Sequence, residues 1–370
     1  MSDSAAPFPY DFYHFWAAGV VARAGGDPYL VSAIHPVMVS VGWRAEEATF
    51  GFLHPFWSLW IFSAISTIPF AAAKWVWEGL VLLLVSVSLL LITRPSVRKL
   101  LALQTPTSFL VFASVLFPPF ISTLHNGQTN PFMLLGLVTW LTLALKQRDL
   151  LAGVALSLTA IKPQLFIPFY VWVFLSNFRS RGCRYTLGFA IGLVLQIGIS
   201  LIIAPNSALY WAESMQQVSN SAMNLPTPAL GRIIAGVVGS DQIPLLLNLL
   251  AICAAVWSAL NVKHESLAPA ILVWLPLSSL VAPYTWTHGF LVLLPLYLAL
   301  LSTFESKRPK LITYGIAALA IVALAEMHHP HTFAGYMVVL PLILLVFGLK
   351  QTKAMTARLA SAFSQVSAHR

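Results

Sequence analysis

Four polar sites interrupt an otherwise apolar chain, and their residue types suit acid–base chemistry and anion binding. Asp11 lies among aromatic residues in the segment Asp11-Phe12-Tyr13-His14-Phe15-Trp16. Partial desolvation there would raise the pKa of the carboxylate toward the value that a general base needs. The alternative is a helix N-cap, since aspartate is a common cap before a helical stretch.

Lys162 is an ionisable residue in the middle of the apolar stretch 150–176. An ammonium group at membrane depth is costly unless it is paired or solvated, which makes such a residue a functional candidate. A compact positive charge suits an anionic group such as a phosphate. Snorkelling is the alternative, although the charge is far from either end of the stretch. Because Pro163 follows, the stretch is predicted to be a broken or re-entrant helix pair.

Two further segments carry polar side chains between apolar runs. The segment His125-Asn126-Gly127-Gln128-Thr129-Asn130-Pro131 offers amide donors and acceptors for sugar hydroxyls or a phosphate, although Asn-Gly is also an ordinary turn signal. His288 follows Trp286 at the start of another apolar run. Its imidazole could move a proton or donate to an anion, or it could be an interfacial side chain beside Trp286.

A histidine-rich group near the C-terminus resembles a metal site, but a short tract of this kind is nonspecific. It comprises Glu326, His328, His329 and His331. No second set of ligands is evident, so we expect an outer interfacial turn with no metal and no cofactor. Glycine-rich phosphate loops, Walker patterns and Ser-His-Asp sets are absent from the sequence, which argues against nucleotide-driven chemistry. This combination suggests an activated donor that is carried by a lipid.

The composition places these sites in a membrane protein. Of 370 residues, 58% are hydrophobic and only 9% are charged, with a mean hydropathy of +0.80. Soluble domains carry about a quarter charged residues. The net charge is +9, and the basic residues cluster between apolar runs. This distribution follows the positive-inside rule, so we expect membrane lipids and not nucleic acid as partners.

The apolar runs predict an all-α, polytopic transmembrane helical bundle with roughly ten membrane segments, of which one is a broken or re-entrant pair. The runs lie at 55–73, 75–92, 103–123, 129–145, 150–176, 185–204, 243–261, 267–284, 288–303, 311–326 and 333–349. Basic residues follow several of these runs, and we place them in the cytoplasm. They lie at 94–99, 146–148, 179–184, 263, 307–310 and 350–358. An odd number of crossings is therefore required between residues 53 and 94, where two runs occur, and one of these is expected not to cross fully.

Connections that are poor in lysine and arginine are expected on the outer, periplasmic side. They comprise 1–53, 124–128, 205–242, 284–287 and 327–332. The predicted organisation has three parts. Residues 1–53 form an outer segment with interfacial helices, residues 54–349 form the transmembrane domain, and residues 350–370 form a basic cytoplasmic tail.

The order of these motifs resembles bacterial glycosyltransferase family 87. The opening signature is similar over Asp11–Gly19 and Gly26-Asp27-Pro28-Tyr29, and later motifs are similar over Gly127–Asn130, Gly153 to Gln164, Pro226–Gly231 and Ala282-Pro283-Tyr284. The resemblance spans nearly the whole chain. It implies the GT-C fold and polyprenol-phosphate-mannose-dependent mannosyl transfer in a bacterial inner membrane, with the active site facing the periplasm.

The resemblance also implies roles for particular residues. Asp11 would be the base of a single inverting displacement at the anomeric carbon, with His288 assisting. The phosphate of the polyprenyl-phosphate sugar donor would be held by Lys162, Gln128 and His125. Contacts to the sugar or to the lipid or glycan acceptor are expected from Tyr13, Asn130, Gln164 and Trp286.

Two features depart from the family pattern. Relatives usually have a transmembrane helix before the acidic segment, whereas only ten residues precede Asp11 here, so either the true start of the protein lies upstream or the first helix is lacking. Several relatives have acidic residues near 284–288, where this chain has Thr285, Trp286, Thr287 and His288. The alternative function is a transporter or flippase for lipid-linked saccharides, which would use Lys162 for binding and would need no base at Asp11.

Overall fold

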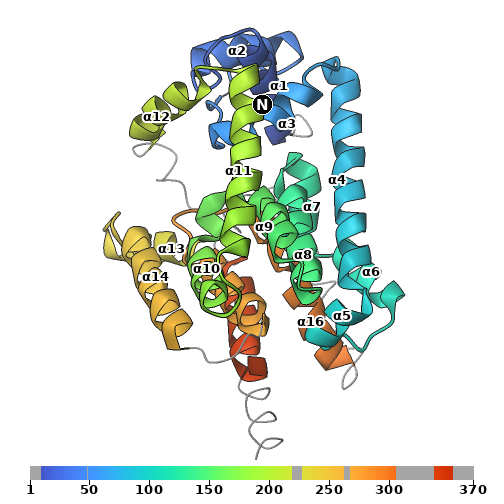
Figure 1. The fold of residues 1–370 in the computed structure, drawn as a ribbon. Helices are drawn as coiled ribbons and strands as arrows, with labels where there is room; N and C mark the ends of the chain where they lie inside the picture. Colours follow the sequence, from blue (N-terminus) through green and yellow to red (C-terminus); the bar gives the residue numbers. More distant parts are fainter. Residues whose placement is uncertain (1–9, 48, 219–226, 262–266, 306–336, 353–370) are drawn as a thin grey trace, which may run out of the picture. The chain divides into compact units, whose positions relative to one another are not determined.

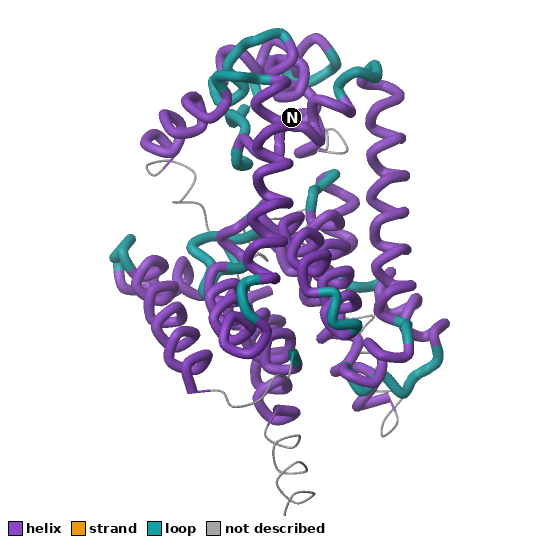
Figure 2. Tube along the Cα trace, in the orientation of Figure 1, coloured by secondary structure: helices purple, strands orange, loops and turns teal. Residues whose placement is uncertain are grey.

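The computed structural model of the chain describes residues 10–47, 49–218, 227–261, 267–305 and 337–352 (Figure 1). All regular structure in these ranges is helical, as Figure 2 shows, which confirms the predicted all-α class. The chain divides into two compact units that each combine separated stretches of sequence. The first unit comprises Met1–Ile92, Pro118–Pro163 and Arg184–Leu225, and the second comprises Thr93–Phe117, Gln164–Cys183 and Pro226–Arg370. The predicted division into an outer segment (1–53), a transmembrane domain (54–349) and a cytoplasmic tail (350–370) is defined by position relative to the membrane, and it stays a prediction.

The first unit contains the helices that position Asp11, Gln128 and Lys162. They are α1 (Tyr10–Arg23), α2 (Val31–Ser40), η1 (Phe56–Ser58), α3 (Leu59–Ile65), α4 (Phe70–Ile92), α7 (Pro118–Asn126), α8 (Asn130–Leu145), α9 (Asp149–Leu156), η2 (Ser157–Ile161), α11 (Arg184–Ile203) and α12 (Ser207–Val218).

The second unit contains the helices around His288. They are α5 (Pro95–Leu100), α6 (Thr107–Val115), α10 (Ile167–Arg181), α13 (Leu230–Val238), α14 (Ile243–Asn261), the π-helical η5 (Ala270–Trp274), α15 (Leu275–Leu280), η6 (Thr287–Leu293) and α16 (Leu294–Glu305). A short helix, η3 (Pro163–Leu165), joins the two units in sequence, and a further apolar helix covers Val339–Thr352.

Four described helices are long and apolar enough to cross a membrane, or five if α6 and α7 count as one bent span. The four cover Phe70–Ile92, Arg184–Ile203, Ile243–Asn261 and Thr287–Phe304. Roughly ten membrane segments are therefore not confirmed, because several predicted runs form apolar helices of only 10–17 residues. Of the two runs between residues 53 and 94, Phe56–Ile65 is short and α4 is long, which matches by length the expectation that one does not cross. The run 311–326 lies outside the described residues.

Helices α1 and α3 approach each other through a glycine. A Cβ on Gly19 would collide with the backbone carbonyl of Phe62 and would lie 2.8 Å from Ser66 Oγ. Nearby, Arg23 Nη1 donates a hydrogen bond to Ser66 O at 2.8 Å. The absence of a side chain at Gly19 therefore lets α1, which carries Asp11, pack directly on the backbone of α3.

The substitution Gly19→Ala is expected to destabilise the protein, because a backbone carbonyl cannot move aside as a flexible side chain can. Overpacking of this kind costs about 1–3 kcal/mol. The matched control is Gly79→Ala in α4, where nothing lies within 4 Å of an added Cβ. Thermal unfolding in detergent should show a lower Tm for Gly19→Ala alone, and equal shifts for the two variants would contradict the proposed close packing.

Helices α9 and α11 also pack through small residues, and Figure 1 shows α9 between α8 and α11. A Cβ on Gly153 would collide with the carbonyl of Tyr185, and one on Gly188 would collide with the backbone of α9. Small residues allow membrane helices this close approach. Further along α11, Gln196 Nε2 donates to Ser157 O at 3.1 Å. The 3₁₀ segment η2 is thus held in place just before Lys162.

The helix break predicted at Lys162-Pro163 is confirmed. Helix α9 tightens into η2, which ends at Ile161, and the next α-helix begins at Ile167. Lys162 has φ −133° and ψ 72°, outside the helical region. A proline ring disfavours helical angles at the residue before it, so the sequence favours a helix end there.

Candidate functional site

The chain between α7 and α8 forms a Schellman turn that presents Gln128. Gly127 has φ +64°, the left-handed region that favours glycine. Its N–H donates to Leu124 O at 3.2 Å, and Gln128 N–H donates to Thr123 O at 3.0 Å. These are the two hydrogen bonds of a Schellman motif. The turn predicted from Asn-Gly is therefore present, and its hydrogen bonds fix the backbone of Gln128.

A buried tryptophan of α4 fixes this turn. Trp77 is fully buried, and its Nε1 donates to Gly127 O at 2.7 Å. The indole also stacks on Phe12 of α1, with ring centroids 5.3 Å apart. The turn and the helix that carries Asp11 therefore share one rigid neighbour.

Gln128 joins Asp11 to Lys162 through the two ends of its side-chain amide. Gln128 Nε2 donates a hydrogen bond to Asp11 Oδ2, and Lys162 Nζ donates to Gln128 Oε1 at 2.6 Å. A carboxylate only accepts and an ammonium only donates, so this amide orientation satisfies both charged groups. The structure thus brings together three residues that the sequence singled out separately, from α1, the turn at Gly127 and the end of η2.

The environment of Asp11 favours a basic carboxylate. Burial raises the pKa of Asp11 above its ordinary value, and the Gln128 hydrogen bond and the charge of Lys162 offset this only in part. A carboxylate with a raised pKa takes up a proton more readily than one in water. The neutral amide of Gln128 lies between the acid and the ammonium, so the arrangement offers a base at one end and a cation for an anionic group at the other.

His54 is a member of this region that the sequence analysis missed. It is buried, and its Nε2 lies 3.2 Å from Thr129 Oγ1, next to Gln128 in sequence. Burial lowers the pKa of His54 well below its ordinary value, and the charge of Lys162 lowers it further, so the ring is neutral. The only signal in the sequence was a histidine directly before Pro55, at the start of an apolar run.

The segment Gly26-Asp27-Pro28-Tyr29, which carried part of the family resemblance, holds His54 in place. Asp27 Oδ1 accepts a hydrogen bond from Tyr29 N–H at 2.8 Å, which closes an Asx-type turn. Tyr29 Oη in turn donates to His54 O at 3.1 Å. This signature therefore has a structural use, because it fixes the backbone that carries the imidazole.

Three other predicted residues of the first unit lie near this region in sequence. His125 is partly buried in the last turn of α7, and Asn130 is fully buried at the start of α8. Tyr13 is buried, and its ring packs against Phe70 at 4.4 Å and Trp43 at 5.4 Å. Their roles as phosphate, sugar or acceptor contacts stay predictions.

The remaining predicted residues belong to the second unit. His288 is buried in η6, Trp286 directly precedes that helix, and Gln164 lies in η3. Asp11 belongs to the first unit, and the roles of these three residues stay predictions.

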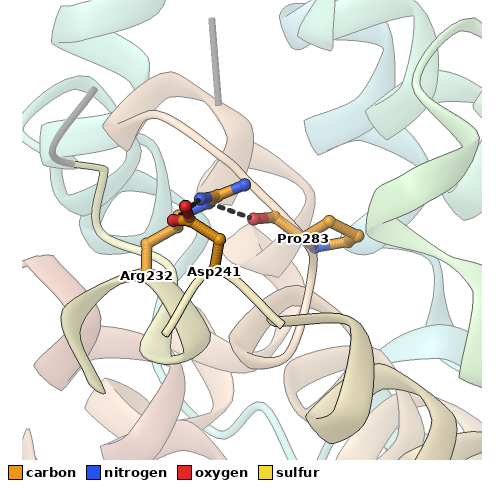
Figure 3. Close-up of polar contacts among 3 residues, drawn as sticks. All are labelled: Arg232, Asp241 and Pro283. Carbon is orange, nitrogen blue, oxygen red and sulfur yellow. Dashed lines mark hydrogen bonds and ion pairs between the residues drawn. The ribbon is translucent and has the colours of Figure 1, made fainter. Parts of the chain in front are cut away.

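Within the second unit, an arginine connects two of the motifs that carry the family resemblance, the one that ends at Gly231 and the one that contains Pro283 (Figure 3). Arg232, next to Gly231, donates from Nε to Pro283 O at 3.2 Å. Its Nη1 lies 3.6 Å from Asp241 Oδ1, but that aspartate is 84% exposed while the arginine is buried. Exposed ion pairs contribute little, so the bond to Pro283 is the specific contact. Arg232 thereby fixes the backbone that leads to His288.

No group of three or more histidine, cysteine, aspartate or glutamate side chains that could hold a metal occurs in the described part of the chain. The group Glu326, His328, His329 and His331 lies outside that part. The prediction that the protein uses no metal or cofactor stays a prediction.

Comparison with known families supports the resemblance given by the motifs. The sequence model of Glycosyltransferase family 87 matches residues 52–283, a stretch that includes Gln128 and Lys162 but neither Asp11 nor His288. No curated protein and no solved structure matches the chain. Because the family match covers more than half of the sequence, the chain belongs to glycosyltransferase family 87.

Proposed function

We propose that this membrane glycosyltransferase moves a hexosyl group, with mannose as the favoured sugar, from a polyprenyl-phosphate sugar to an acceptor hydroxyl. The observation that carries the proposal is the hydrogen-bonded series Asp11–Gln128–Lys162. Family membership supports the transfer of a sugar, and the apolar helices support a membrane setting. Transfer from a phosphate-linked donor needs a base for the acceptor hydroxyl and a cation for the leaving phosphate. Gln128 forms hydrogen bonds with one group of each kind, Asp11 and Lys162.

The proposed reaction is a single inverting displacement. The acceptor oxygen attacks the anomeric carbon, and its proton passes to the Asp11 carboxylate. The bond between the anomeric carbon and the phosphate oxygen breaks, and polyprenyl phosphate leaves with the bonding electrons. Lys162 stabilises the negative charge that develops on this leaving group. Gln128 orients the side chains of Asp11 and Lys162 through its two hydrogen bonds.

The proposed setting is the bacterial inner membrane, with the reaction on the periplasmic side and a lipid or glycan as acceptor. The aromatic residues around Asp11 and the scarcity of lysine and arginine in residues 1–53 support an outer position for α1. A carrier of lipid-linked saccharides would use the same cation for binding, but it would have no need of a base at Asp11.

The test is to incubate the purified protein with an acceptor fraction and a panel of polyprenyl-phosphate sugars, and to measure released polyprenyl phosphate. Release with one sugar, coupled to incorporation of that sugar into product, is the expected result. Transfer from sugar nucleotides, with none from the lipid-linked panel, would contradict the proposed donor.

The pH dependence of transfer should report on Asp11. Only the ionised carboxylate accepts a proton, so kcat/KM is expected to rise with pH through the pKa of this residue. Because the pKa is raised, the acid limb should lie above the ordinary aspartate value of about 3.9. Lys162 lowers this pKa, so Lys162→Met should move the limb to still higher pH. A limb that moves to lower pH in that variant would contradict the assignment.

A further inference from the structure

Two neutral polar side chains near Gln128 have buried atoms that lack a hydrogen-bond partner among the described residues. Asn130 is fully buried, and neither its Oδ1 nor its Nδ2 has a hydrogen-bond partner among the described residues. His54 is 5% exposed, and its Nδ1 also has no partner there. Buried amide and imidazole groups are nearly always hydrogen-bonded in folded proteins, so each unpaired atom calls for an explanation.

Packing prevents His54 from turning away to find a partner. Its Nε2 is engaged with Thr129 Oγ1, and its backbone carbonyl accepts from Tyr29. Phe15 and the imidazole form a T-shaped pair with centroids 4.9 Å apart, and Phe52 stacks on the imidazole at 5.5 Å. Three neighbours therefore contact the ring, and a fourth fixes its backbone, while Nδ1 is left unpaired among the described residues. Such preorganisation is typical of a binding site and costs stability elsewhere.

The two residues are linked to the charged series through the chain segment that carries Gln128. Thr129, which contacts His54, stands in the chain between Gln128 and Asn130. Gln128 has both ends of its amide engaged by Asp11 and Lys162. The three consecutive residues therefore differ in their contacts. Gln128 binds the two charged groups, Thr129 contacts His54, and the amide of Asn130 has no partner among the described residues.

The chemistry of the unused groups selects a neutral ligand. An amide and a neutral imidazole together offer donors and acceptors, which matches hydroxyl groups that donate and accept at once. A phosphate only accepts and carries charge, so it is better served by the Lys162 ammonium. In a polyprenyl-phosphate sugar the hexosyl ring is bonded directly to the phosphate, so hydroxyl ligands beside the cation fit the donor sugar.

We propose that His54 and Asn130 form a subsite that binds hydroxyl groups of the donor's hexosyl ring, beside the series Asp11–Gln128–Lys162. This inference rests on the proposed function, since it takes Lys162 as the ligand of the donor phosphate. It assigns His54 a role in sugar recognition, and it assigns Asn130 to the donor sugar in preference to the acceptor.

The test compares the affinities of two lipids, polyprenyl-phosphate mannose and bare polyprenyl phosphate, with no acceptor present. The variants are Asn130→Leu and His54→Phe, which resemble the native side chains in shape but lack the hydrogen-bonding groups. Each is expected to weaken binding of the sugar-bearing lipid about three- to tenfold, the size of one neutral hydrogen bond, and to leave bare polyprenyl phosphate unchanged. Equal weakening for both lipids, or no weakening for either, would overturn the subsite.

Controls separate recognition from structural damage. Ser63 of α3 is also buried with its Oγ unpaired among the described residues, so Ser63→Ala should leave both affinities unchanged. If Asn130→Leu fails to fold, Asn130→Ser removes the amide with less apolar bulk. His54→Gln keeps an amide in reach of Thr129 and should restore part of the selectivity that His54→Phe loses.

The binding readout also separates this inference from the proposed function. If the wild-type protein binds the sugar-bearing lipid more tightly and both variants keep that preference, only the subsite is wrong. If the wild-type protein binds neither lipid, the proposed donor is wrong, and the subsite is overturned with it.

Discussion

The substitution Asp11→Asn is expected to lower kcat/KM for sugar transfer about a hundred- to ten-thousand-fold, the contribution of a positioned general base. Asparagine has the shape of aspartate, and its Oδ1 can still accept the hydrogen bond from Gln128 Nε2. The site should therefore keep its geometry and lose only the proton acceptor. The measurement is release of polyprenyl phosphate in the presence of acceptor, with donor binding measured in parallel.

The matched control is Asp27→Asn in the same unit. The Asp27 carboxylate accepts from Tyr29 N–H in a turn that asparagine also forms, so transfer should be preserved. Loss of activity in both variants would indicate a general effect of the change on this segment. Full activity in Asp11→Asn would show that another group takes the proton.

The substitution Lys162→Met is expected to raise the donor KM by about ten- to a hundredfold, the effect of losing one hydrogen bond to a charged group. Methionine has a similar length but no charge, so Gln128 Oε1 loses its donor and the donor phosphate loses its cation. The kcat should also fall, because the leaving phosphate gains charge in the transition state. Initial rates over a range of donor concentrations separate the two effects.

Lys74→Met is the control for this charge. Lys74 stands over the ring of Trp75, with Nζ 5.0 Å from the centroid, on a part of α4 where Trp75 is 64% exposed. Its removal should leave the donor KM unchanged. An unchanged KM in Lys162→Met as well would exclude Lys162 from the donor site.

The sequence predicted features that depend on local chemistry. The break at Lys162-Pro163 follows from one proline ring, and the turn at Asn126-Gly127 follows from one glycine. The number of spans could not be predicted in the same way. Hydropathy reports which solvent a stretch prefers, whereas helix length depends on where backbone hydrogen bonds stop. The predicted run at 103–123 is long enough to cross a membrane, yet α6 and α7, which occupy most of it, have nine residues each.

The assembly of the site was beyond prediction because it depends on tertiary contacts. Gln128 lies 117 residues from Asp11 and 34 residues from Lys162, and no spacing rule links such positions. His54 was missed for the same reason, since its partner Thr129 is 75 residues away. The sequence indicated which polar residues are unusual in a membrane protein, but only the fold shows which of them share hydrogen bonds.

The distance along the chain between Asp11 and Lys162 has a consequence for biosynthesis. At ribosomal rates of about 5–20 residues per second, roughly 8 to 30 s separate the synthesis of these two residues. For most of that time the nascent chain carries Asp11 without its partner Gln128, which follows 117 residues later, and Lys162 is made last. Under the proposed roles, a chain truncated after Gln128 would hold the base and the amide but no cation, so we expect such a chain to be inactive.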